Sequence, residues 1–196
     1  MKGVLLGCVV VAIAGILVVG LAVAGSYNRL VNLDEGVKSA WGQVENVYQR
    51  RADLVPNLVE TVKGAAAFEK DTFTAVTEAR ARVGQVNFRN VPDAQEMQKF
   101  QSAQDGLSSA LSRLLVVVEK YPDLKATQNF RDLQAQLEGT ENRIAVERKR
   151  FNDAAQAFNT ARRRFPTVLI ASMFGFSERP YFQAAAGSEK APQVKF

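Results

Sequence analysis

An unbroken apolar stretch near the start of the chain constrains its fold more than any other feature. Residues 3–25, GVLLGCVVVAIAGILVVGLAVAG, contain no charge, no Pro and no strongly polar side chain. As an α-helix that rises about 1.5 Å per residue, this stretch is roughly 34 Å long, enough to cross the ~30 Å hydrocarbon core of a bilayer. We therefore predict a transmembrane anchor over residues 1–25, which makes the lipid bilayer the first partner of the chain.

Two processing signals remain as alternatives to this anchor. A secretory signal peptide has a basic region before a shorter apolar core, whereas only Met1 and Lys2 precede this long stretch. Ala22-Val23-Ala24 is nevertheless similar to a cleavage site. Leu5-Leu6-Gly7-Cys8 is similar to a lipoprotein box, although too few residues precede Cys8 to form the required apolar core. We favour an anchor that is neither cleaved nor lipidated.

The charges and small residues near the anchor bear on topology and assembly. The positive-inside rule compares Lys and Arg at the two ends of a span. Lys2 stands before the stretch, and four basic residues follow it, which favours a cytoplasmic location for the bulk of the chain: Arg29, Lys38, Arg50 and Arg51. The pairs Gly3/Gly7 and Gly20/Ala24 let helices approach closely in lipid, so they fit an oligomer contact as well as an ordinary Gly- and Ala-rich span.

The composition removes most catalytic chemistry. The chain has no His and one Cys, which is Cys8 inside the apolar stretch. It therefore lacks the usual general base, the usual partner of a Ser or Cys nucleophile, and thiolate metal clusters. We predict no catalytic residue, no metal and no cofactor. An enzyme that uses carboxylates alone is a remaining alternative, since Glu138 and Glu141 lie on one helical face.

From Ser26 onward, apolar residues recur at the spacing of helices that pack against one another. The first stripe predicts a helix that continues the membrane helix out of the bilayer: Leu30, Leu33, Val37, Ala40, Val44 and Val47. We expect this helix to end at Arg50–Asp53, because Asp53 can cap a new helix and Pro56 is tolerated in a first turn. A kinked continuous helix is the alternative.

Three further helices are predicted. The second covers about 54–83, residues 84–90 form a loop, and the third covers about 90–121, where Tyr121-Pro122-Asp123 stops it and Asp123 caps the next. The fourth has an unbroken heptad stripe: Phe130, Leu133, Leu137, Thr140, Ile144, Glu147, Phe151, Ala154, Phe158, Ala161 and Phe165. Glu147 is expected to pair with Arg143 or with an Arg of another helix. We predict an all-α fold in which residues 26–166 form an antiparallel up-down bundle of four long helices with coiled-coil-like packing.

The up-down order returns the end of the fourth helix to the membrane. A basic cluster and a short apolar segment follow there, within residues 167–183, and we propose that they contact lipid or a neighbouring subunit: Arg162, Arg163, Arg164, Val168, Leu169, Ile170, Met173, Phe174 and Phe176. The alternative is that the arginines complement the helix dipole and the apolar residues cap the chain's own core. Residues 184–196 are expected to be a flexible tail.

A net charge of +5 does not indicate nucleic-acid binding here. Acidic and basic residues are mixed along the second predicted helix, as on a solvated face. Aromatic residues stand at core spacings rather than between basic residues. With a membrane anchor as well, we predict no nucleic-acid partner.

Several motifs together resemble the LemA family. The resemblance covers essentially the whole chain after the anchor, and its most specific stretch is RRADLVPNLVETVKG, residues 50–64. Other matching stretches are Tyr27–Val31, Ala40–Val44, Glu78–Arg80, Glu119–Ala126, Asn129-Phe130, Leu137–Ile144, Phe151-Asn152, Phe158-Asn159 and Phe165-Pro166. At Ala66–Glu69 the chain departs from the family, which usually has an aromatic residue and a His before the Glu.

The resemblance implies a single-pass protein of the bacterial inner membrane with a long antiparallel helical bundle. Family members are usually drawn with a short extracytoplasmic N-terminus and a cytoplasmic bundle. The family has no established catalytic residues, so the resemblance carries none over.

One charged group within the matching stretch is a candidate interaction rim: Arg50, Arg51, Asp53 and Asn57. At a membrane-distal turn between two helices, these residues would bind a partner or a neighbouring subunit. The alternative, which we favour, is structural, with these side chains capping helix ends and pairing with each other.

The leading functional hypothesis is a non-enzymatic membrane-anchored helical scaffold. It would form a homo-oligomer and organise the membrane or its proteins. The alternative is an adaptor or sensor subunit that binds a membrane enzyme or transport system through the rim.

Overall fold

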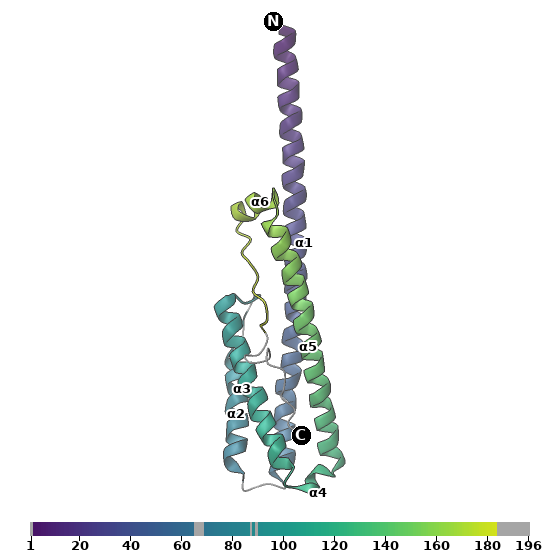
Figure 1. The fold of residues 1–196 in the computed structure, drawn as a ribbon, viewed down its shortest axis with the longest axis vertical. Helices are drawn as coiled ribbons and strands as arrows, with labels where there is room; N and C mark the ends of the chain where they lie inside the picture. The colour runs from purple at the N-terminus through teal and green to yellow at the C-terminus, as the bar shows by residue number, and fades with distance from the viewer. Residues whose placement is uncertain (1, 65–68, 87, 89, 184–196) are drawn as a thin grey trace, which may run out of the picture.

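The computed structural model describes residues 2–64, 69–86, 88 and 90–183 of the chain. All regular elements in these ranges are helices: α1 (Lys2–Lys63), α2 (Lys70–Gln85), α3 (Ala94–Val118), α4 (Pro122–Lys125), α5 (Gln128–Arg163) and α6 (Thr167–Met173) (Figure 1). No strand occurs in the described ranges. The predicted all-α class is therefore confirmed.

The helix α1 projects far beyond the rest of the molecule at its N-terminal end (Figure 1). Its described apolar side chains between Val10 and Val23 are exposed. It is the one helix in the described part of the chain that is long and apolar enough to cross a membrane by length and composition. From Leu30 to Val62 the same helix carries buried residues, so the predicted anchor and the first core helix are one continuous element.

The predicted end of this helix at Arg50–Asp53 is wrong, and the continuous helix is correct. Pro56 lies inside α1, where its missing N–H would leave the carbonyl of Ala52 without a partner four residues back. The guanidinium of Arg80 on α2 supplies the missing donor, because its Nε donates to the Ala52 oxygen at 3.0 Å. Asp53 does not cap a helix; its carboxylate accepts a hydrogen bond from Gln49 at 2.8 Å. The predicted second helix is thus divided between the end of α1 and α2.

The start of α3 follows the sequence closely. Asp93 caps it through a capping box, accepting from the Glu96 N–H at 2.8 Å while the Glu96 carboxylate accepts from the Asp93 N–H at 3.0 Å. The predicted stop at Tyr121–Asp123 opens into the short helix α4 instead of the fourth long helix. Thr127, rather than Asp123, then caps α5.

Most of the heptad stripe of α5 is buried or half-buried, as predicted. Phe165 is the exception and is 81% exposed, because α5 ends at Arg163. Glu147 pairs with Arg150 on its own helix at 2.7 Å, not with Arg143 or another helix.

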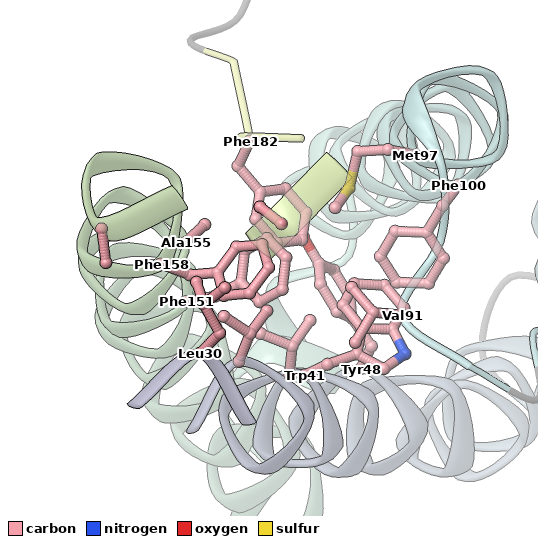
Figure 2. Packing of buried hydrophobic residues seen from close by; sticks show 14 of the residues in the cluster. Leu30, Trp41, Tyr48, Val91, Met97, Phe100, Phe151, Ala155, Phe158 and Phe182 are labelled. Atoms are coloured by element: carbon pink, nitrogen blue, oxygen red, sulfur yellow. The ribbon is translucent and has the colours of Figure 1, made fainter. Parts of the chain in front are cut away.

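The core has two parts. The part nearer the N-terminal projection is aromatic and draws on α1, α3, α5 and the segment after α6 (Figure 2): Trp41, Tyr48, Phe100, Phe151, Phe158 and Phe182. The other part is mainly aliphatic and lies between α1, α2, α3 and α5: Val55, Leu58, Val62, Val76, Leu107, Leu111, Leu114 and Leu137. Helix α5 lies along α1, and α2 lies along α3 (Figure 1).

The predicted domain boundaries do not all coincide with the ends of helices. The boundary at residue 25 lies inside α1, so no linker separates the anchor from the folded part. The segment 167–183 contains α6 and an extended stretch whose last residues enter the aromatic core. The predicted tail, 184–196, lies outside the described residues.

Candidate functional site

Arg51, one of the four residues of the predicted interaction rim, is buried rather than exposed. This side chain is 2% exposed and lies on the buried stripe of α1. Its Nη1 donates to Ser108 Oγ at 2.8 Å and to Glu141 Oε1 at 2.9 Å, and its Nη2 donates to the backbone and side-chain oxygens of Gln104. Arg51 therefore connects α1 to α3 and α5, and neither the exposed rim nor pairing within residues 50–57 describes it.

The other predicted rim residues face solvent. Arg50, Asp53 and Asn57 are exposed along the outer surface of α1, which continues for six more residues from Asn57 to Lys63. They share a surface but do not surround a turn. Glu138 and Glu141, the pair considered for an enzyme that uses carboxylates alone, have different partners. Glu141 pairs with Arg51, whereas Glu138 is exposed and accepts a hydrogen bond from Gln134 at 3.0 Å.

The predicted lipid or subunit segment is divided by α6 into two faces. On the inner face Ile170 is buried in the aromatic core, and Phe176 packs against it. The outer face is exposed, and together with Tyr27 of α1 it forms a surface that we call the collar: Tyr27, Phe165, Val168, Leu169, Met173 and Phe174. The inner residues therefore cap the chain's own core, as the second alternative expects, while the outer residues remain exposed.

The collar lies beside the point where α1 leaves the predicted anchor. The Tyr27 ring is 4.9 Å from the Phe174 ring and 5.8 Å from the Phe176 ring, centroid to centroid. Tyr27 follows the end of the apolar stretch by two residues, so α6 sits at the height where the exposed apolar part of α1 ends (Figure 1).

The basic cluster next to the collar is partly committed to the chain itself. Arg162 Nε donates to the Phe176 carbonyl at 2.7 Å, and Arg163 pairs with Glu178. Hydrogen bonding to Arg163 lowers the pKa of the Glu178 carboxyl, and the same bond raises the pKa of Arg163. Arg164 and Arg29 are exposed at this level, so they are available to an anionic surface.

An extended segment follows α6 over residues 177–183, and we call it the strap; its contacts are not predicted from the sequence. Phe182 inserts into the aromatic core and is 6% exposed, and Arg179 pairs with Asp34 of α1 at 2.5 Å. Asn152 and Asn159 of α5 each bond to the strap backbone. A signal was present, because each Asn follows a core Phe and the two Phe-Asn pairs are seven residues apart.

A polar group is also enclosed in the aromatic core. The indole N–H of Trp41 is buried and makes no well-formed hydrogen bond. Burial raises the pKa of the nearby Glu45 carboxyl, and the Trp41 indole offsets part of that rise. Burial likewise raises the pKa of the Tyr48 hydroxyl. In the described ranges no three His, Cys, Asp or Glu residues are placed to hold a metal ion.

Comparison with known proteins places these features in a family. The family model described as LemA family matches residues 40–196. Two named relatives are Magnetosome protein MamQ 2 of Paramagnetospirillum magneticum, 27% identical over 80% of this chain and 64% of its own length, and Magnetosome protein MamQ of Magnetospirillum gryphiswaldense, 26% identical with the same coverage. Protein LemA of Metamycoplasma hominis is 22% identical over 82% of this chain and 70% of its own. The chain thus spans less than two thirds of the length of the MamQ proteins it matches.

Proposed function

The chain belongs to the LemA family, and from that premise we propose that it is a non-enzymatic membrane-anchored scaffold. In this proposal it self-associates and organises the membrane or the proteins within it. The MamQ relatives carry the name of a cellular structure, the magnetosome, rather than of a reaction, which favours a structural role.

The observation that carries the proposal is the continuity of α1. One helix contains both the exposed apolar stretch and the buried stripe from Leu30 to Val62. A helix without a break transmits position and orientation, whereas a flexible linker would leave the folded part free to tumble. The proposed scaffold is therefore held at a fixed height and angle to the bilayer.

We further propose that the long helices form one antiparallel up-down bundle. Contacts between α1 and α5 support this, because Trp41 lies beside Phe151 while Arg51 bonds to Glu141. The numbers rise on one helix as they fall on the other. The single-pass topology with a cytoplasmic bundle, proposed from the charge distribution, fits this arrangement.

The collar supports contact with the bilayer in the proposed function. Exposed apolar side chains on a monomer's surface mark interaction sites when they are contiguous, and Tyr is favoured at the interface between lipid and water. Arg29 and Arg164 next to the collar would each contribute about 1 kcal/mol of attraction to an anionic leaflet. The outer face of α6 would lie in the headgroup region, parallel to the bilayer.

The direct test is a mass measurement of the full chain in lipid nanodiscs. The scaffold proposal expects one or more discrete oligomers, together with resistance to extraction by alkaline carbonate. A strict monomer that binds no other protein would contradict it. Crosslinking in cells that recovers one dominant partner of a different sequence would instead favour the adaptor or sensor function.

A further inference from the structure

We propose that the surface of α1, α3 and α5 that holds the strap is a peptide-binding groove, and that in an assembly each groove holds the strap of a second copy. This inference rests on the proposed self-association and assigns its contact. The ligand class is an extended peptide with Arg and Phe three residues apart, as in Arg179-Pro180-Tyr181-Phe182.

The groove recognises the backbone of the strap through two side-chain amides. Asn159 donates to the Arg179 carbonyl at 2.8 Å and accepts from the Arg179 N–H at 2.9 Å. Asn152 donates to the Phe182 carbonyl at 3.1 Å and accepts from the Phe182 N–H at 2.8 Å. Each amide thus makes both hydrogen bonds that a neighbouring strand would make.

The spacing of the two amides matches an extended chain. Asn152 and Asn159 are seven residues apart on α5, which is about 10.5 Å along a helix axis. Arg179 and Phe182 are three residues apart, and an extended chain covers about 10 Å in three residues. A helical or coiled ligand would not place its backbone against both amides at once.

The ends of the ligand are read by their side chains. Arg179 pairs with Asp34, and the same carboxylate also pairs with Lys38 at 3.1 Å. The guanidinium carbon of Arg179 is 5.6 Å from the centre of the Phe158 ring. Phe182 enters an aromatic pocket, with its ring centroid 5.5 Å from that of Phe151 (Figure 2), and the Arg148 guanidinium covers it at 4.8 Å. The groove therefore selects a basic and an aromatic residue in a fixed register.

The strap contacts the helices along one side and leaves an open space along the other, as a bound peptide does. Between the strap and α3 lies an open groove of ≈ 570 Å³, lined on the α3 side by Ala94, Met97, Gln98 and Gln101. With α6 left in place, the five residues from Phe174 to Arg179 span up to about 17 Å when extended. The strap can therefore reach the groove of a second bundle that comes within about 17 Å of the first copy's Phe174.

The anchor favours a second copy as the occupant over a soluble peptide. Because α1 is continuous, all copies inserted into one membrane with the same orientation carry the groove and the strap at the same height above the bilayer. Confinement at a shared height raises the effective concentration of one strap near another groove. Exchange of the strap keeps the contacts of the groove intact, which makes it a low-cost route to assembly.

The test uses full-length chains in a Cys8→Ala background, co-expressed with two different tags. One chain carries Gln101→Cys and the other Gln183→Cys, since Gln101 donates to the Gln183 carbonyl at 3.2 Å. A short bis-maleimide reagent should give a covalent dimer that contains both tags. Replacing Gln183→Cys by Gln128→Cys, an exposed position at the other end of α5, should reduce the mixed dimer at least tenfold.

A competitor separates strap exchange from general proximity and needs no folding-sensitive variant. Excess synthetic peptide with the sequence of residues 177–183 should suppress the mixed dimer, while a scrambled peptide should not. The inference is overturned if both cysteines in one chain give only an intramolecular product and separate chains give no mixed dimer. If that occurs in a protein that is oligomeric in nanodiscs, the scaffold proposal stands and only the strap contact fails; a monomer in nanodiscs removes both.

Discussion

A buried cation is the residue that most affects how this fold is held together. Arg51 sits on the apolar stripe of α1, in register with Val44, Tyr48, Val55 and Leu58. Its charge is balanced by Glu141, whose side chain is 43% exposed. Its Nη1 and Nη2 also donate to Ser108 and Gln104 of α3, while its Nε is buried without a partner among the described residues. An unpaired buried charge is costly, so these acceptors fix the spacing of three helices.

The first prediction concerns this pair. Glu141→Gln leaves the Arg51 cation buried without a counterion and should lower the free energy of unfolding by about 1–2 kcal/mol. The loss is smaller than the ~3–5 kcal/mol expected when a fully buried pair is broken, because Glu141 is half-exposed. Denaturant unfolding in detergent micelles measures it. Glu138→Gln, one turn away on the exposed face, is the matched control and should be neutral.

A second prediction follows from Glu45, where burial raises the pKa of the carboxyl. The folded state then favours the protonated Glu45 carboxyl. At low pH this carboxyl does not lower the free energy of unfolding, but it does so as pH rises through its pKa in the folded state. Glu45→Gln should therefore be more stable than the natural chain at pH 7, and the difference should vanish below about pH 4. Thermal unfolding at the two pH values checks this; a variant less stable at pH 7 would show that the charge is favoured.

At the scale of elements, the unbroken path of α1 depends on a contact with α2. Pro56 has no N–H to donate to the Ala52 carbonyl, and Arg80 donates to that carbonyl instead. Arg80→Ala should cost about 1–2 kcal/mol, since it leaves a partly buried carbonyl without a donor. In a Pro56→Ala background the restored N–H takes over, and the cost of Arg80→Ala should fall by about 1 kcal/mol.

A double-mutant cycle measures this coupling directly. Arg82→Ala is the matched control, because Arg82 is exposed and pairs with Glu78 on its own helix. If the costs of Pro56→Ala and Arg80→Ala add without a coupling term, Arg80 does not compensate for the proline.

The elements also show which parts of the fold the sequence predicts. Helices α3 and α5 follow local signals, namely the capping box at Asp93 and the heptad stripe from Phe130. The continuous path of α1 through Pro56 is only the alternative from the sequence, because Arg80, which compensates at Ala52, is 28 residues away from Ala52. Arg51 is misassigned because neighbouring charges suggest solvent, although its position continues the buried stripe.

The candidate site divides in the same way. Composition alone singles out the short apolar segment after the basic cluster, but it does not separate the exposed face of α6 from the buried one. The strap is not, because an extended segment with no regular hydrogen-bonding pattern of its own is fixed only by contacts with distant residues. Asp34, Asn152 and Asn159 are ordinary polar residues until the fold brings Arg179 and Phe182 to them.

A prediction at this scale tests the collar. Met173 is 76% exposed on the outer face of α6, so in a Cys8→Ala background a fluorophore on Met173→Cys should be quenched by lipids brominated on their acyl chains. The control is Val116→Cys, which is 66% exposed near the far end of α3 and should not be quenched. If neither position 173 nor position 116 is quenched, α6 lies away from the bilayer.

For the whole molecule, the continuity of α1 makes the height of the folded part a property of helix length. Inserting a seven-residue helical segment, Glu-Ala-Ala-Ala-Lys-Glu-Ala, between Gly25 and Ser26 adds two turns and about 10 Å. It nearly preserves rotation, because seven residues fall within about 20° of two full turns. The folded part therefore keeps its orientation and moves away from the bilayer as a unit.

The insertion should abolish quenching at position 173 while leaving the thermal unfolding of the folded part unchanged, because no contact within it is altered. It should also leave the mixed crosslink between copies intact, since every copy is raised equally. Quenching that persists after the insertion would mean that the collar finds the bilayer independently of α1. In that case the anchor only tethers the folded part, and the shared height on which strap exchange depends would not be set by this helix.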